Sequence, residues 1–174
     1  MNSFSKGEYI NYATSGVCLI EDITKLDYLH NNNPQEFYVL KPLRNNTSTV
    51  YVPIENEKLI SKMRKLLSKE EIDSLIDSSK SDAIEWINDR KVRSEKFKSI
   101  ISKAEPCKLL QLVSCIYMKK LELKNVGKKL SSTDDSFLGI AEGLIENEFS
   151  FVMNLSGAQL GAYIRERLGI EAEI

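Results

Sequence analysis

The sequence predicts an α+β chain of two unlike domains: a small antiparallel β-barrel over residues 1–57 and an all-α bundle of about five helices over residues 58–174. Two observations support this division. Before residue 58, short runs rich in β-branched and aromatic residues are separated by turn formers, with no helix between them. After residue 57, apolar residues recur at spacings of three and four, as on one face of a helix.

The predicted strands lie in the four runs EYINY, VCLIEDI, EFYVLK and TVYVPI. Several short strands in so short a segment are typical of a barrel of the Tudor or SH3 kind. Side chains alternate along a strand, so Val50 and Val52 are expected on one face of the last run and Tyr51 on the other. Pro53 is expected to end this strand, because proline has no N–H to donate to a ladder.

The helical pattern begins directly after the last predicted strand, with apolar residues at helical spacing: Leu59, Ile60, Met63, Leu66 and Leu67. Ser68 and Glu71 then form a capping box, which predicts a short helix over residues 68–76. Longer helices are expected from about residue 82 to 102 and over residues 106–125. Serines suited to N-capping begin the last two helices, expected over residues 131–153 and 156–169.

The net charge of −1 is an average over three blocks. Residues 1–57 carry 4 basic and 7 acidic side chains, residues 58–129 carry 18 and 10, and residues 130–174 carry 2 and 8. The total disfavours a uniformly basic nucleic-acid binder, but the middle block, at +8, has the charge of a phosphate-binding surface. Lysines that only solvate exposed helix faces explain the same count, so both interpretations stay open.

The only tryptophan, Trp86, lies in this basic block, at the edge of a stripe formed by Ala83, Ile87, Phe97 and Ile101 in the predicted helix. One interpretation is a boundary core residue that packs against a neighbouring helix. The other is a partly exposed aromatic side chain that stacks on, or wedges beside, a base where a duplex opens while nearby cations hold the phosphates. Helical periodicity does not decide between them.

Enzymatic and metal chemistry is disfavoured. His30 is the only histidine, and the sequence has no Gly-rich phosphate loop and no Cys/His or Ser/His pair at plausible spacing. Asp134 and Asp135 follow two serines and are better explained by helix capping than by catalysis. We therefore expect a protein that is not an enzyme and has no cofactor or metal.

The sequence also predicts where the protein resides. Its start lacks the apolar core of a signal peptide, and the longest apolar-rich run, Leu109–Met118, is too short to span a bilayer. The three widely spaced cysteines favour reduced thiols over a disulfide framework. We expect a cytoplasmic protein without membrane contact.

Four N-terminal segments follow one another in a recognisable order: Phe4-x-x-Gly7-Glu-Tyr-Ile-Asn-Tyr12, Ser15-Gly16-Val-x-x-Ile20-Glu-x-Ile23, Phe37-Tyr-Val-Leu-Lys41 and Val50-Tyr-Val-Pro53-x-x-Asn56. They resemble the N-terminal domain of the CarD/CdnL-type bacterial transcription regulators. In the helical half, the family's tryptophan segment and its penultimate long helix are matched by Trp86-x-x-x-Arg90-Lys91-Val92 and Leu130-Ser-Ser-x-Asp134-x-x-Phe137-Leu138. The resemblance covers nearly the whole chain.

The resemblance implies a transcription regulator whose Tudor-like domain binds the RNA polymerase β subunit, largely by edge-to-edge strand contact. The implied polymerase contacts are Lys25, Leu26, Val50, Tyr51, Val52 and Pro53. The helical domain would stabilise the open promoter complex at the upstream edge of the transcription bubble, where the family's tryptophan acts as a minor-groove wedge. The implied DNA contacts are Trp86, Arg90, Lys91, Arg93, Lys128 and Lys129.

Two departures from the family pattern affect these contacts. Family members often carry arginines at the position of Tyr51 and near Lys25 or Leu26, so the polymerase contact is expected to differ in detail. They also often carry arginines directly after the tryptophan, where this chain has Asn88 and Asp89 in a WxxDRxxR pattern. The basic contacts are therefore expected to shift to the cations that follow.

A second function remains possible from the sequence. In this alternative the chain is a protein-binding adaptor, whose barrel docks a partner strand while the bundle is a scaffold without DNA contact. In either case we expect a monomer.

Overall fold

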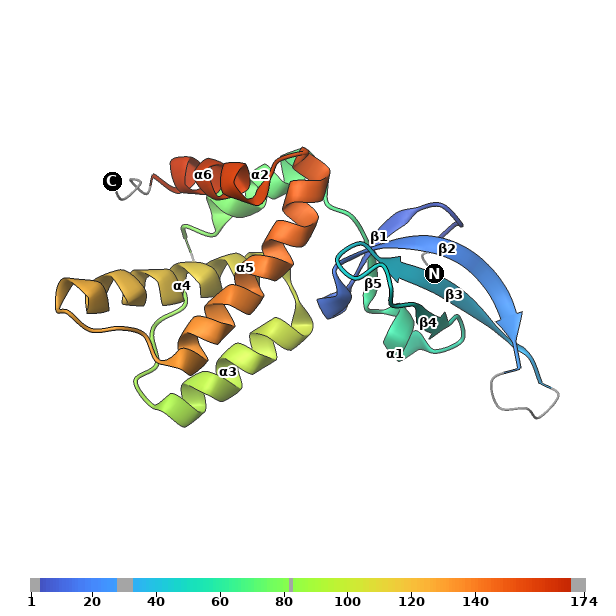
Figure 1. Cartoon of the computed structure of the whole chain (residues 1–174), viewed down its shortest axis with the longest axis horizontal. Coiled ribbons are helices and arrows are strands. Elements are labelled where there is room, and N and C mark those ends of the chain that lie inside the picture. The colour runs from blue at the N-terminus through green and yellow to red at the C-terminus, as the bar shows by residue number, and fades with distance from the viewer. Residues whose placement is uncertain (1–3, 28–32, 82, 170–174) are drawn as a thin grey trace. The chain divides into compact units, whose positions relative to one another are not determined.

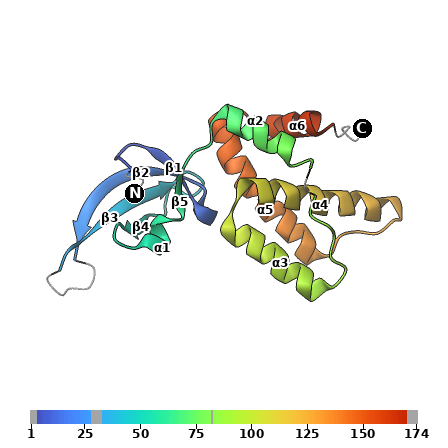
Figure 2. The same ribbon diagram turned by 180° about the vertical axis from the view of Figure 1, so that it is seen from behind.

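The computed structural model describes residues 4–27, 33–81 and 83–169, so the predictions at His30 and Asp82 lie outside the described residues. The chain divides into two compact units, Met1–Leu66 and Leu67–Ile174, called here the N-terminal unit and the helical unit. Figures 1 and 2 show the strands in the first and the longer helices in the second. The division predicted after Glu57 is too early, because the residues that follow complete the N-terminal unit.

The N-terminal unit is built on a five-stranded antiparallel sheet with the strand order β4-β3-β2-β1-β5. Its strands are β1 (Tyr9–Tyr12), β2 (Val17–Leu26), β3 (Gln35–Pro42), β4 (Val50–Pro53) and β5 (Met63–Lys65). The four predicted strands are confirmed, and β5 is an addition. In the described sheet β4 and β5 each pair with one neighbour, so closure into a barrel stays a prediction.

The core of the N-terminal unit lies on one face of this sheet. The register pairs Ile20 with Leu40 and Tyr38 with Val52, and these four side chains are at most 6% exposed. Tyr51, next to Val52 on β4, is 52% exposed. The predicted alternation along this strand is therefore confirmed.

The helical pattern predicted for residues 59–67 holds for a single turn only. Helix α1 (Glu57–Ile60) starts after Asn56, whose side chain accepts a hydrogen bond from the Leu59 N–H at 3.1 Å. The chain then turns into β5, which buries Met63 in the core of the sheet. The helical turn and the strand together bury Leu59, Ile60 and Met63 at least in part, as a continuous helix would also have done. The spacing of apolar residues therefore did not distinguish a continuous helix from a turn followed by a strand.

The described part of the helical unit contains five helices. They are α2 (Lys69–Ser78), α3 (Arg90–Lys103), α4 (Pro106–Asn125), α5 (Ser132–Met153) and α6 (Gly157–Leu168). With α1, the described residues form six helices, against about five predicted for the bundle. The expected caps of α2, α5 and α6 are confirmed, since the hydroxyls of Ser68, Ser131 and Ser156 each accept a backbone N–H from the first turn.

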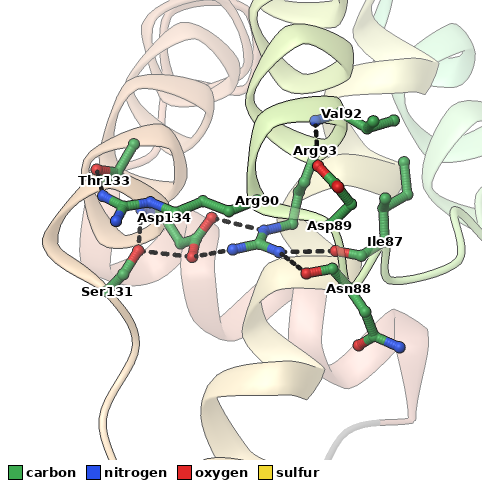
Figure 3. Close-up of polar contacts among 9 residues, drawn as sticks. All are labelled: Ile87, Asn88, Asp89, Arg90, Val92, Arg93, Ser131, Thr133 and Asp134. Carbon is green, nitrogen blue, oxygen red and sulfur yellow. Dashed lines mark hydrogen bonds and ion pairs between the residues drawn. The ribbon is translucent and has the colours of Figure 1, made fainter.

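The core of the helical unit gathers side chains from several helices. Helices α4 and α5 pack along each other, α3 packs on both, and α2 packs on α4, α5 and α6. Phe97, Leu112, Ile116 and Phe149 are each at most 1% exposed. This packing brings the start of α3 next to the start of α5, which are more than 40 residues apart in sequence (Figure 3).

Helix α3 begins eight residues later than predicted, at Arg90 rather than near position 82. Asp89 ends the preceding segment in an extended conformation, and its Oδ1 accepts a hydrogen bond from the Val92 N–H at 2.9 Å. An N-cap of this kind fixes where a helix starts. Residues 83–87 therefore have no regular secondary structure, and the predicted stripe through Ala83 and Ile87 is wrong.

None of the helices in the described ranges is long and apolar enough to cross a membrane. The thiols of Cys18, Cys107 and Cys115 are free.

Candidate functional site

The first candidate surface is the outer edge of β4. The Ile54 N–H donates to the Glu36 carbonyl at 2.9 Å, which fixes the hydrogen-bonding phase of β4 on β3. In this phase Val52 pairs with β3, whereas the backbone groups of Tyr51 and Pro53 point toward the open edge. Pro53, which has no N–H, is compatible with such a position. The edge therefore offers the Tyr51 N–H and C=O to a strand of another protein.

This geometry separates the four β4 residues predicted as polymerase contacts. Tyr51 and Pro53 face the edge, and Tyr51 also has an exposed side chain. Val50 and Val52 direct their backbone groups to β3, and the Val52 side chain is fully buried. Val52 does not fit the direct contact predicted for it, because neither its backbone nor its side chain is accessible from the edge.

Lys25 and Leu26, the other two predicted polymerase contacts, are the last two residues of β2. Lys25 pairs with Glu36 on β3, and the next residue of β3, Phe37, pairs with Pro53 on β4. Two strand spacings of about 4.8 Å separate β2 from β4, so these residues lie ~10 Å from the β4 edge, at the same end of the sheet.

The second candidate surface surrounds Trp86. The side chain is partly buried and packs against the core of the helical unit. Its ring meets Phe97 edge-on, with 6.2 Å between the ring centroids. The guanidinium of Arg93 and the ammonium of Lys119 lie 4.4 Å and 5.7 Å from the Trp86 ring centroid. Trp86 thus has the core contact of one interpretation and the cationic surroundings of the other.

Arg93, whose guanidinium lies next to the Trp86 ring, is also at the centre of a group of polar contacts. Figure 3 shows these contacts. Its Nε and Nη2 donate to the two carboxylate oxygens of Asp134 at 2.9 and 3.0 Å. Its Nη1 donates to the carbonyl oxygens of Ile87 at 2.7 Å and Asn88 at 3.2 Å. Arg93 is only 6% exposed, so it does not fit the phosphate contact predicted for it. Four of its five N–H groups are directed at these partners, and burial keeps the guanidinium away from a phosphate.

Asp134 is held as a carboxylate in this cluster. Burial by itself would raise the pKa of its carboxyl group, but hydrogen bonds from Arg93 and Ser131 and the nearby positive charge outweigh burial and lower the pKa. The Ser131 hydroxyl donates to the Asp134 Oδ2 at 2.6 Å and also accepts the Asp134 N–H. Asp134 is therefore both a capping partner, as predicted, and the counter-ion of Arg93.

The remaining predicted DNA contacts are exposed cations on two segments. Arg90 and Lys91 are exposed at the start of α3, and the Arg90 Nη2 donates to the Thr133 hydroxyl at 3.2 Å. Lys128 and Lys129 are exposed in the loop between α4 and α5. That loop leads directly to Ser131, so it enters the Arg93 cluster.

The sequence reasoning missed two residues of this surface. Lys119 comes from α4, more than 30 residues from Trp86, and no local pattern links the two. Asp134 was missed as the partner of Arg93 for the same reason, because the two residues are 41 positions apart. The sequence did contain a signal for the start of α3: Asp89 precedes a run of helix formers, and an aspartate at such a position is a common N-cap.

A scan of known protein families matches the N-terminal unit. Residues 4–66 match the model of the CarD-like/TRCF RID domain, an RNA polymerase-interacting domain. The match ends at the boundary between the two units. It confirms the resemblance to a CarD-like domain over this part of the chain and supports a transcription-related role that involves RNA polymerase binding. No curated protein matches the chain.

The residues matched by the CarD-like model include one group of predicted contacts and exclude the other. All six predicted polymerase contacts lie inside residues 4–66, and all six predicted DNA contacts lie outside. The matched domain is a protein-interaction domain rather than a catalytic one. The open β4 edge, which holds four of the predicted polymerase contacts, lies within the matched residues.

Proposed function

We propose that the chain is a transcription regulator that binds the RNA polymerase β subunit through the β4 edge and stabilises the open promoter complex through Trp86. The observation that carries the first half is the CarD-like match on the unit that contains the open edge. Strand addition there needs only main-chain donors and acceptors, and Tyr51 offers both outward. The family's arginine is therefore not required for pairing, and the exposed side chain of Tyr51 is not required for it either.

The second half rests on the surroundings of Trp86. A partly exposed indole with Phe97 behind it is a rigid apolar surface for an unstacked base. The exposed cations Arg90 and Lys91 lie directly after the tryptophan segment and suit phosphate contacts. The part of the basic block that lies in the helical unit, residues 67–129, carries 14 basic and 10 acidic side chains and so keeps an excess of positive charge.

The adaptor alternative also has an observation in its favour. Trp86 packs against Phe97 and so already has a role in the core of the helical unit. A helical scaffold without DNA contact would need nothing more from it. The two functions differ in whether the exposed part of Trp86 matters on a promoter.

The test uses the full chain, RNA polymerase and a weak promoter. Tyr51→Pro deletes the outward N–H without removing a bond to β3. We expect this variant to lose polymerase binding and therefore to fail to stabilise the open complex. Tyr51→Ala keeps that N–H and is the matched control, with binding retained. Trp86→Ala is expected to bind polymerase normally and to shorten the open-complex lifetime. An unchanged lifetime with Trp86→Ala would favour the adaptor.

A further inference from the structure

Trp86 lies in a segment that secondary structure does not hold in place. Residues 83–87 lie between α2 and α3 and have no regular structure, and the Asp89 cap keeps α3 from extending into them. Neither neighbouring helix therefore fixes the direction in which the indole points. Tertiary contacts must do so if the side chain is to present one surface.

Arg93 makes such contacts with the segment itself. Its Nη1 donates to the carbonyl oxygens of Ile87 and Asn88, the two residues that directly follow Trp86. The same guanidinium lies 4.4 Å from the centroid of the Trp86 ring. One planar group thus contacts both the backbone that carries the indole and the indole itself.

Asp134 holds that guanidinium in a single orientation. The two carboxylate oxygens accept from Nε and Nη2 at 2.9 and 3.0 Å, which leaves Nη1 directed at the two carbonyls. Ser131 in turn holds the carboxylate through its hydroxyl. The side chains of the pair are 7% and 4% exposed, so water competes little for these bonds.

We propose that Arg93 and Asp134 are positioning residues for Trp86: the pair, anchored on α5, holds the segment after α2 so that the indole presents one fixed surface. A simple tie between α3 and α5 would need only the bonds between Arg93 and Asp134. The bonds to Ile87 and Asn88 are additional and go to the tryptophan segment. The consequence for transcription rests on the function proposed above, whereas the positioning itself does not.

Trp86 is the only tryptophan, so its fluorescence reports positioning in the full chain without polymerase or DNA. Asp134→Asn keeps the size of the side chain but removes the charge that orients the guanidinium. Arg93→Lys keeps the positive charge but cannot bond the carboxylate and both carbonyls in one plane. In both variants we expect red-shifted emission and stronger acrylamide quenching, at a temperature where the helical circular dichroism is unchanged.

Asp135→Asn is the matched control, since Asp135 is the next residue and forms an exposed pair with Lys120 at 3.2 Å. Its emission and quenching are expected to equal those of the parent chain. The proposal is overturned if Asp134→Asn and Arg93→Lys unfold at lower temperature but keep the parent emission and quenching while folded. That result would make the pair a tie between helices and nothing more.

A second measurement connects positioning to function. With polymerase and a weak promoter, Asp134→Asn is expected to lose at least half of the open-complex lifetime that Trp86→Ala loses, with polymerase binding unchanged. A parent lifetime for Asp134→Asn, beside a shortened one for Trp86→Ala, would overturn the functional consequence of positioning. If Trp86→Ala itself has no effect, the proposed function fails, and the fluorescence comparison still decides whether the pair positions Trp86.

Discussion

The two candidate surfaces differ in what holds them in place. At the β4 edge, the outward direction of the Tyr51 backbone follows from the pairing of β4 with β3. At the second surface, Trp86 lies outside regular structure and depends on Arg93 and Asp134, which are 41 residues apart. The first surface is a property of the main chain and tolerates side-chain change, whereas the second depends on individual side chains.

The largest effect that separates the two surfaces is expected from Asp134→Ala. The substitution leaves the Arg93 charge buried without its counter-ion, and breaking a buried pair in this way costs roughly 3–5 kcal/mol. We expect the free energy of unfolding of the helical unit to fall by that order. Urea unfolding followed by Trp86 fluorescence measures the helical unit selectively, because the N-terminal unit contains no tryptophan.

The comparison variant is Asp22→Ala in the N-terminal unit, whose unfolding is followed by circular dichroism because that unit contains no tryptophan. Asp22 pairs with Lys6 at 3.0 Å, but the two side chains are 50% and 66% exposed, and such pairs are worth about 0–1 kcal/mol. Acid should weaken both pairs, because the pKa of Asp22 is also lowered, first by its hydrogen bond from Lys6. The pKa of Asp134 is lowered in the folded state, so its stabilisation is present above the unfolded pKa of about 3.9 and is lost as pH falls through the folded pKa. Equal losses in the two variants would remove the distinction between the surfaces.

The same difference explains how much of the structure could be predicted from the sequence. The four strands, the serine caps and five helices of the bundle follow from local patterns, and the structure contains them. The start of α3 was missed because residues 83–88 continue the apolar spacing of the helix after them. Asp89 stops the helix there, and the sequence reasoning took it for a missing arginine. Arg93 was misassigned because its partner Asp134 is remote in sequence.

The charge blocks also change when they are counted by structural unit. The N-terminal unit carries 8 basic and 7 acidic residues, and the helical unit carries 16 and 18. The basic block therefore spans both units, because four of its cations precede Leu67: Lys58, Lys62, Arg64 and Lys65. Within the helical unit, Arg93 is buried in its ion pair and Lys119 is paired with Glu122. Sequence proximity thus overstated how many cations share one exposed surface.

The next largest expected difference is in salt dependence: DNA binding should weaken with salt much more than polymerase binding does. Among the predicted DNA contacts, four are exposed cations: Arg90, Lys91, Lys128 and Lys129. At a slope of about −0.9 per phosphate, affinity for a duplex should fall on the order of 10²-fold between about 50 and 200 mM salt. Polymerase binding through main-chain hydrogen bonds of β4 should fall far less. Fluorescence anisotropy of labelled DNA, and pull-down of polymerase, at matched salt concentrations measure the two slopes. Two equally steep slopes would mean that the polymerase contact is also carried by charge.

The smallest expected effect comes from the cap that separates Trp86 from α3. Asp89→Ala removes the acceptor of the Val92 N–H, and loss of such a cap costs about 1 kcal/mol, whereas Asp89→Asn keeps an acceptor and should cost little. Without the cap, the helical spacing of residues 83–88 can extend α3 toward Trp86. The carbonyls of Ile87 and Asn88 would then bond within the helix and leave Arg93. This extension would slow the exchange of the Lys91 and Val92 amides and alter the Trp86 emission. Both changes are expected in Asp89→Ala and not in Asp89→Asn. Unchanged emission in both variants would mean that Arg93 and Asp134 hold the segment without the help of the cap.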